Sequence, residues 1–150
     1  MKRGKIIEAF KLVNSIKMNT VKDKETRSAI ISNHLSMYKV AQMHDEEVKS
    51  VYALLFEGKE ADMKHVSDLR QEYRLTSDPE TQAKIVKDLS ENYAHIFELE
   101  KEFNDIFAQK ADEDIDINIV KFDKAVFIDA CVESGIEITM RDIVFFEELF

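Results

Sequence analysis

Cysteine, proline and glycine are scarce in this chain of 150 residues, which has one Cys, one Pro and three Gly. A single cysteine, Cys131, excludes an internal disulfide, and its apolar neighbours favour a buried structural thiol over a nucleophile. The three glycines stand alone, which excludes a Gly-rich phosphate-binding loop. So few helix breakers, among many Glu, Lys, Leu, Ile and Ala residues, predict long helices.

Long apolar runs are also absent. No segment approaches the roughly 20 apolar residues that cross a bilayer, and MKRGKIIEAF returns to charge too soon for a signal peptide. The net charge of −9 disfavours direct nucleic-acid binding, because phosphate contacts need clustered Lys and Arg. Basic residues concentrate in residues 1–24, which can face solvent, dock on an acidic partner, or dock on the chain's own acidic part.

Apolar residues recur at helical spacing along most of the chain. The pattern predicts helices over residues 3–18, 23–56 and 79–109, the last opened by Asp78 as N-cap and Pro79. Residues 59–75 are also helix-prone, and they either continue the second helix past Gly58 with a kink or form a separate shorter helix. The helix over 23–56 has a broad apolar stripe that includes Ile31, Leu35 and Tyr38. Because the helix over 79–109 matches it in length and pattern, we expect these two to pack antiparallel along most of their length.

Near the C-terminus the spacing of the apolar residues changes from the 3.6-residue period of a helix to a period of two residues. Ile115, Ile117 and Ile119 alternate with polar residues, as in a strand with one buried face. A helix from Asp123 to Gly135 follows, then the short alternation Ile136–Ile138, then a last helix capped by Thr139 and Asp142. Two strands joined by a helical crossover are typical of a parallel βαβ pair.

The sequence therefore predicts a mainly α protein: a long antiparallel helical hairpin or bundle with a short N-terminal helix and a small C-terminal βαβα appendage. We expect the hairpin over residues 1–110 and the appendage, packed on it, over 111–150, with a single domain as the alternative. A two-stranded sheet leaves a backbone edge open for a partner strand. The predicted partner-contact residues are Ile115, Ile117, Asn118, Ile119, Ile136 and Ile138.

The residue types that carry chemistry have no catalytic or metal-binding spacing. The histidines at 34, 44, 65 and 95 include no pair four residues apart, and Asp62-x-x-His65 occurs once. A Gly-x-Ser-x-Gly motif is also absent. We therefore expect no enzyme, no catalytic residues, no metal and no cofactor.

Four segments carry a resemblance to a known family: Leu12–Lys24, Asp78–Glu80, Ile115–Ile119 and Ile138–Leu149. In their order and pattern the chain resembles a family of small uncharacterised phage and prophage proteins encoded among virion and tail genes. The resemblance implies a non-enzymatic minor virion or tail component, or an assembly chaperone. It also implies partners among other phage virion proteins or further copies of the chain, and a location in the virion or the host cytoplasm.

Two other functions are compatible with the composition. An acidic phage-encoded effector that mimics DNA and inhibits a host protein would show carboxylates in two rows at phosphate-like spacing. A small metal- or ligand-binding helical bundle would show a stoichiometric metal on elemental analysis.

Overall fold

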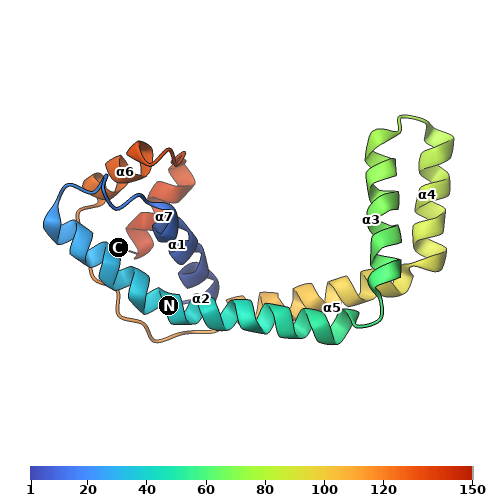
Figure 1. The fold of residues 1–150 in the computed structure, drawn as a ribbon, viewed down its shortest axis with the longest axis horizontal. Coiled ribbons are helices and arrows are strands. Elements are labelled where there is room, and N and C mark those ends of the chain that lie inside the picture. Colours follow the sequence, from blue (N-terminus) through green and yellow to red (C-terminus); the bar gives the residue numbers. More distant parts are fainter. Residues whose placement is uncertain (150) are drawn as a thin grey trace. The chain divides into compact units, whose positions relative to one another are not determined.

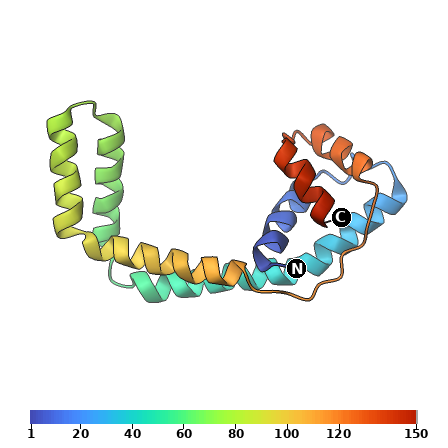
Figure 2. The ribbon, with the colours of Figure 1, turned by 180° about the vertical axis from the view of Figure 1, so that it is seen from behind.

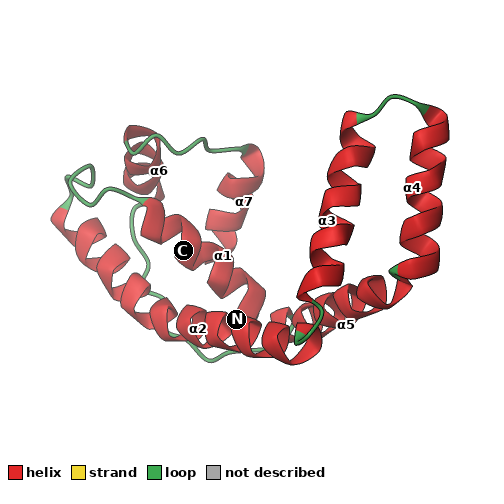
Figure 3. Cartoon of the chain, turned by 45° about the vertical axis from the view of Figure 1, so that its right-hand side comes forward, coloured by secondary structure: helices red, strands yellow, loops and turns green. Residues whose placement is uncertain are grey.

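The chain is mainly helical. In this computed structural model, which describes residues 1–149, there are seven helices and no strand (Figures 1 and 3). The helices are α1 (Arg3–Ser15), α2 (Lys24–Phe56), α3 (Glu60–Leu75), α4 (Pro79–Asn92), α5 (Ala94–Ala111), α6 (Lys124–Glu133) and α7 (Met140–Leu149). Among the described residues, no helix is both long enough and apolar enough to cross a membrane.

Several helix ends lie where the sequence predicts them, because the capping side chains make the expected hydrogen bonds. The Asp78 carboxylate accepts a hydrogen bond from the Thr81 N–H at 2.9 Å, and Pro79 begins α4. Before α7, the hydroxyl and the N–H of Thr139 donate to the Asp142 carboxylate at 2.6 and 2.8 Å. These two hydrogen bonds favour the charged carboxylate, so the pKa of Asp142 lies below its usual value.

The helix predicted over residues 79–109 is in fact two helices, α4 and α5, with a break at Tyr93. The Tyr93 backbone leaves the helical region at φ −124° and ψ 15°, and its hydroxyl lies 3.1 Å from Nδ1 of His65 on α3. Because α2 ends before Gly58, at φ +73°, a separate α3 is available to pair with α4 (Figure 1). The predicted pairing along most of the length of both helices is therefore wrong: α4 pairs with α3, and α5 contacts α2.

Two compact units make up the chain. The first contains Met1–Asp45 and Lys110–Phe150, and the second contains Glu46–Gln109. In the second unit, α3 and α4 lie side by side and the Phe103 ring of α5 contacts Phe56 of α2 at a centroid distance of 6.4 Å. The C-terminal residues thus share a unit with α1 and the first part of α2.

The core of the first unit is built by α1, α2, α6 and α7 together. Phe127 of α6 and Phe146 of α7 are fully buried and meet edge to face, with ring centroids 5.2 Å apart. The other buried members are Ile6, Ala9, Val13, Ile16, Val21, Ile30, Met37, Ala130 and Cys131. Burial raises the pKa of the Cys131 thiol to about 11, with a smaller contribution from the Asp142 carboxylate, so this thiol is protonated and unreactive at neutral pH.

The predicted βαβα appendage is wrong, since neither alternating segment forms a strand within residues 1–149 (Figure 3). The backbone of each segment hydrogen-bonds to a different part of the chain. The backbone of Ile115 bonds to that of Met1, and the Ile136 N–H donates to the Cys131 carbonyl at 3.0 Å, at the end of α6. Two strands without further support are marginal, so the hydrogen bonds to Met1 and to the end of α6 prevail. The period of two is nevertheless kept, because Ile115 is turned towards the core and Asp116 towards solvent.

Basic residues near the N-terminus pair with the chain's own acidic C-terminal part. Four ion pairs join them: Lys2 with Asp114, Arg3 with Glu113, Lys5 with Glu148 and Lys22 with Glu133. All eight residues belong to the first unit. The basic N-terminal residues therefore serve, in part, to hold the two ends of the chain together.

Candidate functional site: an anchored extended segment

An extended segment, Asp114–Val120, joins α5 to α6 and is held at both of its ends. We call it the anchored segment. It runs beside the first part of α2 (Figures 1 and 2). Five of the six predicted partner-contact residues, Ile115, Ile117, Ile119, Ile136 and Ile138, are partly buried against the core of the first unit, and the sixth, Asn118, is exposed. The structure thus places the isoleucine side chains inward and leaves the Asn118 side chain exposed.

The first anchor is an antiparallel bridge to the N-terminus. The Ile115 N–H donates to the Met1 carbonyl at 2.8 Å, and the Met1 ammonium donates to the Ile115 carbonyl at 2.9 Å. One step further on, the Arg3 N–H donates to the Glu113 carbonyl at 2.8 Å. The Lys2 side chain adds an ion pair to Asp114, and its hydrogen bond lowers the pKa of that carboxyl below its usual value.

The second anchor is the side chain of Asn33 on α2. Its Nδ2 donates to the Val120 carbonyl at 2.9 Å, and its Oδ1 accepts the Val120 N–H at 2.7 Å. The amide thus bonds both backbone groups of Val120, as a neighbouring strand would. Asn33 is fully buried, so these bonds satisfy a polar group that would otherwise be costly to bury.

Sequence reasoning did not identify Asn33. Asn33 is polar and is therefore not part of the apolar pattern of α2. The one available signal is its spacing, since it follows Ile30 by three residues and precedes Met37 by four, and both of these are fully buried. A polar residue in register with a buried face needs a partner inside the protein, and an amide matches a backbone N–H and C=O pair. Asn33 is therefore a positioning residue for the anchored segment.

Between the anchors, the backbone of residues 116–119 makes no hydrogen bond to the rest of the described chain, residues 1–149. In an extended chain, alternate residues direct their N–H and C=O groups to the same side. The alternation of partly buried and exposed side chains along residues 115–120 is that of an extended chain, so we expect the groups of Ile117 and Ile119 on the side where Ile115 meets Met1. By the same alternation, Asn118 shares its side with Val120, whose two backbone groups are bonded to Asn33.

Polar contacts also gather between α3 and α5 in the second unit. His95 Nε2 lies 2.9 Å from Asp62 Oδ2, and the Arg70 guanidinium binds both oxygens of Glu100 at 2.9 and 2.7 Å. Arg70 also lies over the Phe97 ring, 4.9 Å from its centroid. The side chains of Asp62 and Arg70 on α3 each have a polar partner on α5, so this cluster braces α3 against α5.

Groups of three or more His, Cys, Asp or Glu side chains suited to a metal ion are absent among the described residues. Comparison of the chain with protein-family models, with curated proteins and with solved structures gives no match.

Proposed function

We propose that this protein acts by binding other proteins and not by catalysis, as a minor virion or tail component or an assembly chaperone of a phage or prophage. The phage setting rests on the resemblance carried by four segments of the sequence. The mode of binding rests on one observation, which is the open backbone of residues 116–119 between two fixed ends.

The proposed contact is the addition of one strand from a virion or tail protein. Met1 and Ile115 already form an antiparallel pair, and a partner strand continues that pair along Ile117 and Ile119. The anchors hold the segment extended before the partner arrives, so less conformational entropy is lost on binding. The exposed Asp116 and Asn118 discourage pairing with unrelated strands.

The test uses the genes that neighbour this one. The chain is co-expressed with the virion proteins encoded beside it, and assembled particles or single partners are isolated by sedimentation and by affinity capture. Neighbours unrelated to virions contradict the phage setting. If virion neighbours are present and the chain sediments with none of them, the assembly role is wrong.

The strand contact is tested by occupying the edge from within the chain. A short β-prone extension placed before Met1 would run antiparallel to Ile117 and Ile119 and compete with the partner, whereas a Gly/Ser extension of equal length would not. We expect the first extension alone to abolish capture. Equal capture by both variants contradicts the contact on this side.

Asn118→Pro distinguishes the two sides of the segment. It removes an N–H from the side opposite Met1 and leaves the Ile117 and Ile119 groups unchanged, so folding and capture are expected to survive. If the variant folds and capture is lost, the partner binds the Asn118 side instead. Val120→Pro is the matched control for folding, because its N–H is bonded to Asn33 and its loss destabilises the protein.

A further inference from the structure

One face of α2 in the first unit is apolar and exposed, which is unusual beside a well-filled core. Ile31, Leu35 and Tyr38 belong to the stripe that the sequence analysis expected to be packed, yet they are 46%, 64% and 48% exposed. They are four and three residues apart, so they lie along one side of the helix. The buried side of α2 is formed instead by residues such as Asn33 and Met37.

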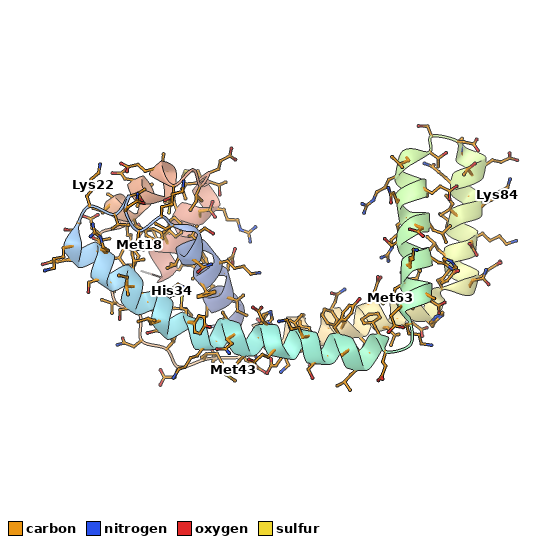
Figure 4. The ribbon with its side chains drawn as sticks, in the orientation of Figure 1. Met18, Lys22, His34, Met43, Met63 and Lys84 are labelled. Atoms are coloured by element: carbon orange, nitrogen blue, oxygen red, sulfur yellow. The ribbon has the colours of Figure 1, made fainter. Side chains whose placement is uncertain are left out.

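A groove of about 190 Å³ adjoins these residues, between the C-terminal end of α1 and α2. Ile31 and Leu35 form its α2 side together with His34, and Val13 and Met18 are among the residues on its other side. Figure 4 shows His34 on the side of α2 that faces α1 and Met43 on the opposite side. Because a cavity of about 150 Å³ accommodates benzene, this groove has room for one aromatic ring.

Charged residues lie on the same face of α2 on both sides of the apolar residues, with positive charge before them and negative charge after them. Lys24 and Arg27 precede Ile31 by seven and four residues, and Asp45 follows Tyr38 by seven. We name the whole row, Lys24, Arg27, Ile31, Leu35, Tyr38, Gln42 and Asp45, the α2 stripe. All of its members lie in the first unit. It is basic at its start, apolar at its centre and acidic at its end.

This order is complementary to itself when one copy is reversed. If two stripes run antiparallel about a two-fold axis near Leu35, Lys24 of one copy lies opposite Asp45 of the other. Ile31 then lies opposite Tyr38 of the second copy, beside the groove that Ile31 lines. Every apolar residue of the stripe meets an apolar residue, while Lys24 meets the oppositely charged Asp45 and Arg27 meets the neutral Gln42.

We infer that the occupant of this face is a second copy of the same chain, and that the protein forms an isologous dimer through antiparallel α2 stripes. The α2 stripe and the groove together contain fewer residues than the roughly 20–30 that each partner contributes to a standard protein interface. The dimer is therefore weak and depends on protein concentration. It is independent of the anchored segment, which remains open in each copy.

The first test measures the monomer–dimer equilibrium by sedimentation equilibrium over a range of concentrations. The wild type is expected to dimerise, and Leu35→Glu, which places two carboxylates near the axis, to raise the dissociation constant at least about tenfold. Met43→Glu is the matched control, since Met43 is 59% exposed on the same helix but on its other side. A monomeric wild type, or equal weakening by both variants, overturns the proposal.

The second test fixes the orientation. Lys24→Glu and Asp45→Lys are each expected to weaken the dimer, and the double variant, which restores the pair with exchanged signs, to recover it. A spin label on Lys24→Cys, measured at a protein concentration that keeps this variant dimeric, reports the distance between the two copies. In the antiparallel dimer the labelled sites are separated by about 21 residues of helix, or roughly 30 Å. A separation near 10 Å, the spacing of adjacent helices, would indicate a parallel pair and overturn the proposed register.

Discussion

Replacing Asn33 by Ala tests whether one buried amide holds the anchored segment in place. The substitution removes the two hydrogen bonds to Val120, 2.9 and 2.7 Å long. A backbone group left unpaired costs about 1–3 kcal/mol when it is buried. Because Val120 is 39% exposed, water reaches part of the site, and we place the total loss near 2–3 kcal/mol. For a chain of this size that corresponds to a fall in melting temperature of roughly 4–12 °C.

Two measurements together check this magnitude. Thermal unfolding followed by circular dichroism gives the loss of stability, and amide hydrogen exchange shows whether the Val120 N–H loses its protection. Asn118→Ala, on the exposed face of the same segment, is the control and should change the stability by less than about 0.5 kcal/mol. Unchanged melting and unchanged Val120 exchange in Asn33→Ala would refute the anchoring role.

Asn33→Asp provides a second check with a defined pH dependence. When charged, the introduced carboxylate accepts the Val120 N–H but cannot donate to the Val120 carbonyl, and its charge is buried. Burial raises the pKa of a carboxyl, so acidification protonates the side chain and restores a donor. The variant should therefore gain stability relative to wild type as the pH falls from about 7 towards about 5. A constant difference across this range would contradict the geometry.

Further predictions concern single residues elsewhere in the chain. Ile96→Asp places a charge at a position that is 1% exposed and should lower the stability by several kcal/mol; near-native melting would contradict the packing of α5. Arg70→Ala removes the ion pair with Glu100, whose two side chains are 40% and 33% exposed, and should cost no more than about 1 kcal/mol, less at high salt. Cys131 should resist a thiol reagent at neutral pH in the folded protein and react after unfolding. The pKa of Asp142 is lower in the folded than in the unfolded protein, so its stabilising contribution is present above about pH 4 and is lost as the pH falls through the folded value. In Asp142→Asn the acid-dependent loss of stability, measured by melting between about pH 6 and about pH 2, should be smaller.

Local signals in the sequence determined most helix positions. Asp78 with Pro79, Asp123, Thr139 with Asp142, and Gly135 mark helix ends in the structure, because each acts through hydrogen bonds or backbone conformation within a few residues. The alternation of Ile115, Ile117 and Ile119 also predicted correctly which side chains turn inward. Those features depend on near neighbours alone.

Pairing between distant segments was decided only by the tertiary structure. The sequence does not reveal that Met1 and the Asn33 amide take the backbone positions that a second strand would have filled, or that α4 pairs with α3 while α5 packs on α2. It also cannot say which part of a broad apolar stripe is covered, so Leu35 resembles a core residue until the positions of α1 and α6 are known. The physical reason is that an extended segment and a helix face each have several possible partners of similar energy, and the choice depends on which of them the rest of the fold brings within reach.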